Sequence, residues 1–270
     1  MPRSLFALLP VLTVAAGLAL ASRPAPAAKA AAPKAHPAAL AAGRVPVVVE
    51  LFTSEGCSSC PAADAALREL EAAQSVPGVE VLALGQHVDY WNRLGWKDPF
   101  SSPQFTARQR WYAEGFKESS YTPQAVVNGR YEFVGSQRAT LAATVAKAAQ
   151  APRATVTLAT PAPGQLAVTV GQLPAGTTAT RVALVLTETG LSSQVGRGEN
   201  GGRLLRHAAV VRAWRELGAV ETNGTFTATA PLQLDAAWKP ANLRAVVLVQ
   251  ETASHHIVGV ASLPLAAAAN

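Results

Sequence analysis

Only two cysteines, Cys57 and Cys60, occur in the 270 residues of this chain, and two serines separate them. Such a pair can exchange disulfides, bind a metal or form a structural cross-link. A cross-link would stabilise little, because its effect grows with loop length and this loop is very short. A closed metal site usually takes four ligands, and a soft copper site often uses a methionine, whereas the sole methionine here is Met1. Redox chemistry is therefore the favoured interpretation, with metal binding and a structural disulfide as alternatives; the spacing alone is weak evidence, and the position of the pair supplies the stronger support.

The segments on either side of the cysteine pair suit redox chemistry. The β-branched run Val45–Thr53 predicts a buried strand, and Pro61–Ala73 predicts a helix that begins at the pair. Free N–H groups and the macrodipole at a helix N-terminus favour a thiolate. We expect Cys57 to be an exposed nucleophile, and Cys60, in the first helical turn, to resolve the mixed disulfide. Glu55 opposes thiolate formation, so the sequence gives no pKa for Cys57.

The rest of the first half alternates strands and helices. Strands are predicted at Val79–Val88 and in a hairpin at Gln124–Gly135, which turns at Asn128-Gly129. Helices are predicted at Ser102–Phe116 and Gln137–Gln150. The order β-α-β-α-β-β-α predicts an α/β domain over residues 45–150, with a four-stranded mixed sheet and helices on both faces.

The second half, residues 151–270, reads as a mainly antiparallel β domain. Short strand-like runs separated by turn residues fill residues 154–265 and predict a sandwich-like arrangement. A short helix is predicted around Arg212–Gly218, and the boundary between the halves is placed near Ala151-Pro152.

A glycine motif in the second half resembles a nucleotide-binding fingerprint in its spacing only. Gly196, Gly198 and Gly201 spell G-x-G-x-x-G, but the neighbourhood is rich in strands, whereas a nucleotide site needs a following helix. We interpret the motif as a turn. The nearby polar residues predict a solvated loop, with contact to the first half or to a ligand as the alternative; they are Arg197, Glu199, Arg203 and His207. His255 and His256 lack partners at metal-ligand spacing.

Several residues near the predicted strand ends are candidates for assisting the cysteines. His87 either shuttles protons during exchange or is hydrogen-bonded within the strand end. Glu50 is a buried acid that accepts the proton of Cys60 if it points inward, and an ordinary surface acid if it points outward. Trp91 and Trp96 lie in a predicted loop, where they are candidates for a wall that contacts substrate.

The N-terminus predicts export. Arg3 precedes an apolar run from Leu5 to Ala21, and small residues suited to cleavage follow it. This layout predicts a signal peptide at residues 1–21, with cleavage as late as residue 27, and hence a periplasmic or secreted protein. The run is shorter than the roughly 20 apolar residues of a spanning helix and contains Pro10, so no stable membrane anchor is expected after cleavage.

The charge of the chain comes largely from a tether next to the signal peptide. Residues 22–44 are mostly Ala, Pro, Lys and Arg, a composition typical of a disordered linker. Residues 1–44 hold five basic and no acidic side chains, which leaves 18 basic against 17 acidic residues in the remainder. A nucleic-acid binder concentrates positive charge on its folded surface, so the sequence argues against that class.

The stretch "VELFTSEGCSSCP", Val49–Pro61, resembles the strand–turn–CxxC–helix opening of the thioredoxin superfamily. Tyr121-Thr122-Pro123 matches a second mark of that superfamily, a cis proline that faces the CxxC and pairs with substrate through its neighbouring backbone. More narrowly, that stretch, "YTPQAVVNG" and "GRGENGGR" resemble an exported thioredoxin-like family catalogued as domain of unknown function 1223. The resemblance implies a thioredoxin-like fold at 45–150 and a secreted location. It implies no established reaction.

Together these features predict an exported thiol–disulfide oxidoreductase acting on protein or peptide disulfides, with an unknown redox partner. Cys57 attacks, Cys60 resolves, and Thr122 with Pro123 binds an extended substrate segment. No dissociable cofactor and no separate metal site are expected. The alternatives are a metal-binding module or metallochaperone that uses the CxxC thiolates, and a non-catalytic binding protein built on a thioredoxin scaffold.

Overall fold

A computed structural model describes residues 43–265, all of which lie in one compact unit. The predicted signal peptide and all but the last two residues of the predicted tether lie outside the described residues. Within the described part of the chain, no helix has the length and apolar character needed to cross a membrane.

The first half contains the strands and helices in the predicted order. The elements are β1 (Val45–Thr53), α1 (Cys60–Ala73), β2 (Val79–His87), a 3₁₀ turn (Asn92–Leu94), α2 (Pro103–Phe116), β3 (Gln124–Val127), β4 (Tyr131–Val134) and α3 (Arg138–Ala148). β1 pairs in parallel with β2 and antiparallel with β3, and β3 pairs antiparallel with β4. The predicted order and the mixed pairing are confirmed.

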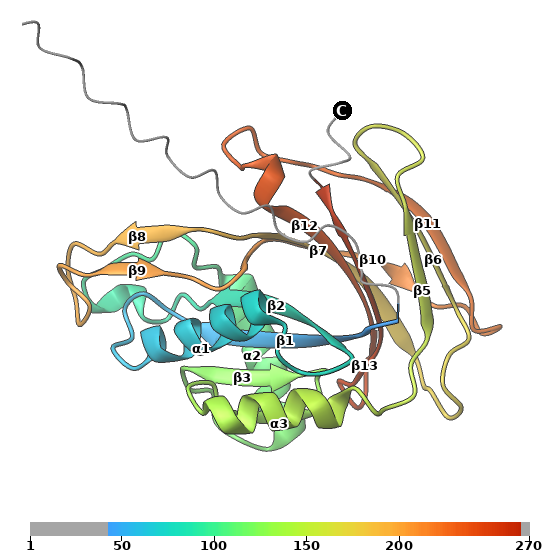
Figure 1. Cartoon of the computed structure of the whole chain (residues 1–270), viewed down its shortest axis with the longest axis horizontal. Helices are drawn as coiled ribbons and strands as arrows, with labels where there is room; N and C mark the ends of the chain where they lie inside the picture. The colour runs from blue at the N-terminus through green and yellow to red at the C-terminus, as the bar shows by residue number, and fades with distance from the viewer. Residues whose placement is uncertain (1–42, 266–270) are drawn as a thin grey trace, which may run out of the picture. The chain divides into compact units, whose positions relative to one another are not determined.

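The second half does not form a separate sheet, because four of its strands extend the sheet of the first half. Its elements are β5 (Thr155–Ala159), β6 (Gln165–Gly171), β7 (Thr180–Glu188), β8 (Ser192–Gln194), β9 (Leu204–Arg206), β10 (Val210–Ala219), β11 (Phe226–Pro231), a 3₁₀ turn (Pro240–Asn242), β12 (Leu243–Glu251) and β13 (Ile257–Pro264). The main sheet has eight strands in the order β13-β12-β7-β10-β2-β1-β3-β4 (Figure 1). The predicted four-stranded sheet is therefore half of a larger one.

The helix predicted around Arg212–Gly218 is a strand instead. These residues lie in β10, which pairs antiparallel with β7 from Val210 to Ala219 through two register shifts. Pairing along this whole length outweighs the local helical pattern, as tertiary context commonly does.

Three of the remaining strands form a second layer, and β8 and β9 pair with each other in a separate two-stranded sheet. β5, β6 and β11 make a three-stranded sheet, and its apolar residues share a core with those of β7 and β12. Leu166 and Val168 of β6 pack in the same cluster as Leu184 and Val247. The predicted antiparallel pairing of the second half is confirmed, and the two layers bury a common core as in a sandwich.

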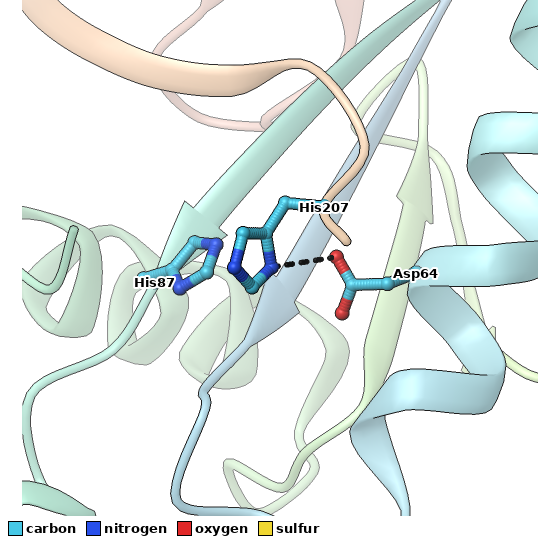
Figure 2. Close-up of side chains that lie close together, drawn as sticks. All are labelled: Asp64, His87 and His207. Atoms are coloured by element: carbon cyan, nitrogen blue, oxygen red, sulfur yellow. Dashed lines mark ion pairs between the residues drawn. The ribbon is translucent and has the colours of Figure 1, made fainter. Parts of the chain in front are cut away.

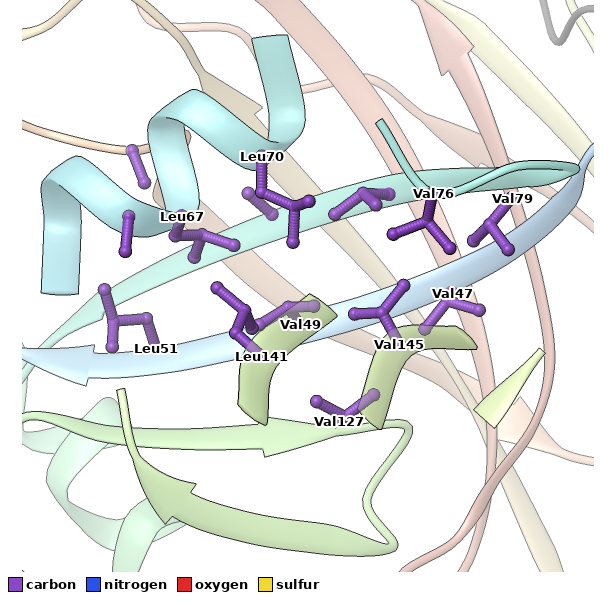
Figure 3. Packing of buried hydrophobic residues seen from close by; sticks show 14 of the residues in the cluster. Val47, Val49, Leu51, Leu67, Leu70, Val76, Val79, Val127, Leu141 and Val145 are labelled. Atoms are coloured by element: carbon purple, nitrogen blue, oxygen red, sulfur yellow. The ribbon is translucent and has the colours of Figure 1, made fainter. Parts of the chain in front are cut away.

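The two faces of β1 are covered by different helices. Val47, Val49 and Leu51 pack against α1 and α3, as Figure 3 shows. Val48 and Phe52, which point to the other face, pack with α2 residues Phe105 and Tyr112 respectively. This alternation follows from the period of two along a strand. It also decides which side of the sheet each polar residue of β1 can reach.

A close contact joins the second half to the carboxyl end of β2. The Gly85 N–H donates to the Ala209 carbonyl at 2.6 Å, and Val210 pairs with Gly85. A Cβ added at Gly85 would lie 3.1 Å from that carbonyl oxygen, so a glycine permits the approach. Ala208 and Ala209 consequently lie in the core beneath α1, and His207, just before them, is brought to the start of that helix.

Candidate functional site

Cys57 and Cys60 form a disulfide where β1 gives way to α1. The sulfurs are 2.13 Å apart, and Cys60 is the first residue of α1. The position at a helix N-terminus is confirmed. The predicted exposure is wrong, because Cys57 is only 1 % exposed. The intervening residues Ser58 and Ser59 do lie at the surface.

A loop from the second half packs against the turn that holds the buried Cys57. The covering loop, residues 195–203, connects β8 to β9, which lie beside α1 in Figure 1. The buried Asn200 side chain donates from Nδ2 to the carbonyl oxygens of Glu55 and Cys57, at 2.9 Å each. Glu199 accepts a hydrogen bond from the Ser58 N–H at 2.9 Å. The backbone of the cysteine turn is thus held by side chains about 140 residues away.

The glycine motif forms the turn of this covering loop. The Gly201 N–H donates to the Gly198 carbonyl, and Gly198 has a φ of +77°. A Cβ added at Gly196 would lie 3.1 Å from the ring of Trp96, so a glycine lets the loop approach that ring. The interpretation of the motif as a turn is therefore confirmed.

The polar residues of the motif divide between the two predicted roles. Arg197 and Arg203 are exposed, as expected of a solvated loop. Glu199 and His207 instead contact the first half, at Ser58 and Glu55 respectively. The alternative of contact with the first half is the correct one for these two residues.

A buried group of ionisable residues lies next to the cysteine turn, which contributes Glu55 to it. It consists of three carboxylates and two imidazoles, here called the acid–histidine cluster: Glu55, Asp64, His87, Asp98 and His207. His87 Nδ1 lies 2.7 Å from Asp98 Oδ2, and His207 Nε2 lies 3.0 Å from Glu55 Oε1. His207 Nδ1 lies 3.9 Å from Asp64 Oδ1 (Figure 2). The two imidazole rings meet edge to face, with centroids 4.9 Å apart.

The pKa values in this cluster reflect a competition between burial and neighbouring charge. Burial alone would lower the pKa of His87. The adjacent Asp98 carboxylate acts in the opposite direction and, with the other nearby carboxylates, outweighs burial, so the pKa of His87 is raised overall. Burial alone raises the pKa of Asp98, but His87 and hydrogen bonds from the backbone N–H groups of Glu55 and Phe100 lower it overall. The charged forms of this histidine–carboxylate pair therefore stabilise each other.

Glu50 is buried, but it faces away from the cysteines. Its Oε2 accepts from Gln86 Nε2 at 2.6 Å and from Arg108 Nε at 2.5 Å. Its Oε1 accepts from Arg108 at 2.9 Å and from the Tyr112 hydroxyl at 2.5 Å. Arg108 and Tyr112 belong to α2, on the face of the sheet opposite α1. The geometry therefore gives no support to a proton transfer between Glu50 and Cys60.

Three of the residues predicted to bind substrate or assist the cysteines, Trp91, Thr122 and Pro123, lie near the cysteine turn at the end of β1. The Thr122–Pro123 peptide is cis, and Gln124 pairs with Phe52, so both residues lie beside the end of β1. Trp91 Nε1 donates to Thr122 Oγ1 at 2.9 Å, and a Cβ added at Gly56 would lie 3.1 Å from Trp91 Cβ. Trp91 thus lies between the cysteine turn and Thr122.

Trp96 has a different position from the one expected of a substrate-facing wall. Its Nε1 donates to Glu55 Oε2 at 2.7 Å, and its ring lies against Gly196 of the covering loop. Trp96 therefore packs between the cysteine turn and the covering loop.

Sequence reasoning missed several residues of the site. Asp64 carried one readable signal, because it lies four residues after Cys60 and therefore on the same side of α1. Asp98 and Asn200 lie in irregular segments and carried none. Chemically, the site combines a disulfide at a helix N-terminus with a group that can hold a metal, since ligand atoms of Asp64, His87 and His207 lie within 4.8 Å of one another.

Comparisons with known proteins give a family but no activity. Residues 48–250 match the sequence model of the family described as "Protein of unknown function (DUF1223)", and the chain belongs to that family. A crystal structure of a structural-genomics target protein from Agrobacterium tumefaciens is similar, with a TM-score of 0.62 and 26% identity, over 80% of this chain and 93% of that one. Among curated proteins, none matches the chain.

Proposed function

We propose that this DUF1223 protein is an exported thiol–disulfide oxidoreductase that acts on disulfides of proteins or peptides. The observation that supports it most is the Cys57–Cys60 disulfide at the N-terminus of α1. Helix N–H groups and the macrodipole at this position stabilise a thiolate, which lowers the free energy of the reduced pair. The very short loop argues against a cross-link kept for stability.

The exchange itself needs only the two sulfurs. In the reducing direction, the Cys57 thiolate attacks one sulfur of a substrate disulfide and releases the other as a thiolate. The Cys60 thiolate then attacks the Cys57 sulfur, which re-forms the intramolecular disulfide and releases the second substrate thiolate. Two electrons pass from the cysteine pair to the substrate, and a separate redox partner restores the dithiol. The oxidising direction is the reverse of these steps.

The fold around the pair supports a thioredoxin-like mode of substrate binding. Strand β1, helix α1 and strand β2 form a parallel crossover unit, and the Thr122–Pro123 segment lies beside the end of β1. An extended substrate segment bound along this edge would contact Thr122 and Trp91. The proposed location of the protein, in the periplasm or outside the cell, follows from the predicted signal peptide.

Burial of Cys57 adds one requirement to the proposal. A substrate sulfur must approach in line with the disulfide, but Cys57 is buried, and the covering loop is hydrogen-bonded to its turn through Asn200 and Glu199. We therefore assign the covering loop a gating role, in which its displacement exposes Cys57. The oxidised and closed form is the one described above.

Trapping of mixed disulfides, together with a redox titration, tests the proposal. Cys60→Ser should accumulate a mixed disulfide through Cys57 with a disulfide-containing peptide, because the resolving thiol is missing. Cys57→Ser is the matched control and should trap little. The wild-type pair should titrate reversibly with a potential in the range of known oxidoreductases, roughly −270 to −120 mV. A potential below about −300 mV, together with no trapping by Cys60→Ser, would identify a structural disulfide and refute the proposal.

A further inference from the structure

We infer that Asp64, His87 and His207 form a binding site for a divalent transition-metal ion next to the cysteine turn. The three residues come from α1, from the end of β2 and from the segment after β9, so only the folded chain brings them together. All three are buried, and one ligand atom of each lies within 4.8 Å of the others (Figure 2). The inference goes beyond the proposed redox function and does not depend on it.

Each of the three residues is oriented by a further hydrogen bond. His87 is held through Nδ1 by Asp98, and His207 is held through Nε2 by Glu55. Asp64 accepts from the Thr53 hydroxyl through Oδ2, at 2.7 Å. Metal-binding histidines are typically oriented in this way, with the nitrogen that does not bind metal paired to a carboxylate or carbonyl. These hydrogen bonds leave Nε2 of His87, Nδ1 of His207 and Oδ1 of Asp64 as the candidate ligand atoms.

One of these three atoms has no partner. Among the described residues, His87 Nε2 is a buried side-chain nitrogen without any hydrogen bond, and it belongs to a residue only 1 % exposed. Asp64 Oδ1 receives only a long hydrogen bond, 3.4 Å, from the Ala208 N–H. An unsatisfied polar atom in the interior costs about 1–3 kcal/mol. Metal binding requires the neutral form of His87, in which Nδ1 donates to Asp98 and Nε2 presents a lone pair, so the ion would displace the Nε2 proton of the charged form.

The charge of the acid–histidine cluster also favours a cation. Glu55, Asp64 and Asp98 are buried carboxylates, and within residues 43–265 their only ion pairs are with His87 and His207. With neutral imidazoles the ionised cluster would carry a formal charge of about −3, which is costly in a low-dielectric interior. A divalent ion would reduce that charge to about −1.

The donor set selects the class of metal. Two imidazole nitrogens and one carboxylate oxygen suit zinc and its first-row neighbours, whereas magnesium and calcium prefer oxygen ligands throughout. In the tetrahedral geometry typical of zinc, ligand atoms about 2.1 Å from the ion are about 3.4 Å apart, so binding requires them to move closer by up to about 1.4 Å from the 4.8 Å limit. Three protein ligands leave a fourth position open to water or to a further ligand.

Titration of the oxidised protein tests this inference, because the proposed donors do not include the cysteines. Disulfide-form protein, stripped with a chelator, should bind Zn(II) with one-to-one stoichiometry by calorimetry. It should also bind Co(II) with visible d–d absorption. His87→Asn and Asp64→Asn should each weaken Zn(II) binding at least 100-fold. His256→Asn, at a histidine outside the cluster, is the matched control and should bind as the wild type does.

Two further measurements keep the result interpretable. Circular dichroism should show that Asp64→Asn, which retains the size of the side chain and an acceptor for Thr53, is folded. The double variant Cys57→Ser/Cys60→Ser should still bind Zn(II), which separates this site from thiolate binding. The inference is overturned if the oxidised wild type binds neither ion below about 100 μM. Unchanged binding in a folded Asp64→Asn variant, or loss of binding in the double cysteine variant, would overturn it equally.

Discussion

Two buried networks of charged residues flank β1, and they differ in how completely their charges are paired. On the face covered by α2, each oxygen of Glu50 accepts two hydrogen bonds, and Arg108 supplies a bidentate positive partner. At the end of the strand, the three carboxylates of the acid–histidine cluster also accept hydrogen bonds from neutral groups, but within residues 43–265 their only ion pairs are with His87 and His207. Both networks are buried, and both reach into the second half, through Gln250 and His207 respectively.

The difference underlies the separate roles that we propose for the two networks, a structural one for Glu50 and Arg108 and a metal-binding one for the cluster. A buried carboxylate with a bidentate arginine is complete, and its removal leaves an uncompensated charge. In the acid–histidine cluster, His87 Nε2 has no hydrogen-bond partner among the described residues, and this is the feature on which the proposed metal site rests. Burial alone therefore does not identify the site. The two networks are distinguished by how completely their hydrogen-bond donors, acceptors and charges are paired.

The largest expected effect comes from breaking the complete network. Glu50→Ala should lower the free energy of unfolding by about 3–5 kcal/mol, because Arg108 is left buried without its carboxylate. Urea denaturation measures the change. Glu50→Leu/Arg108→Met removes both charges and should lose much less. Equal losses in the single and double variants would mean that packing, and not the unpaired charge, causes the effect.

Glu71 shows what burial does to an acid that belongs to neither network and has no ion pair among the described residues. Burial raises the pKa of Glu71 to about 7, although Arg244 and backbone N–H groups act against the shift. The folded state thus holds a proton that the unfolded state loses near pH 4.5, so stability is full below that pH and falls as pH rises towards 7.

Glu71→Gln should remove this dependence. At pH 8 the variant should be more stable than the wild type by up to about 3 kcal/mol, and at pH 4 the advantage should disappear. Urea denaturation of both proteins across this range measures it. A constant difference between them at all pH values would contradict the assignment.

A smaller effect is expected from changing the residue that orients His87. Asp98→Asn keeps the size of the side chain but weakens its hold on the imidazole, and should lower Zn(II) affinity about 10–100-fold. Calorimetric titration of the oxidised protein measures the change. Asp235→Asn, at an exposed residue outside the cluster, serves as control. Unchanged Zn(II) affinity in Asp98→Asn would show that the pair does not support the site.

The smallest effect is expected at the covering loop. Asn200→Ala removes two hydrogen bonds to the cysteine turn and should accelerate reduction of the disulfide by a small thiol about tenfold, because the loop opens more often. The reduction rate is followed with dithiothreitol under limiting conditions. Asn223→Ala, in an exposed turn distant in sequence, is the control. Equal rates of disulfide reduction in Asn200→Ala and the wild type would contradict the gating role proposed for the covering loop.

Much of the first half could be predicted from the sequence because its signals are local. The β-branched run of β1, Pro61 at the start of α1 and the Asn128-Gly129 turn each act within a few residues. The second half was predicted less well. Its antiparallel pairing was correct, but the helix expected around Arg212–Gly218 is part of β10, since pairing with β7 outweighs local preference.

The sequence by itself determined the cysteine pair, its place between a strand and a helix, and the order of the elements around it. Only the tertiary structure decided that Cys57 is buried, that Glu50 faces α2, and that His207 joins Asp64 and His87. The physical reason is the range of the interactions. Local preferences are encoded in neighbouring residues, whereas the pairing of β10 with β2 brings together segments more than 120 residues apart and is settled by the packing of the whole core.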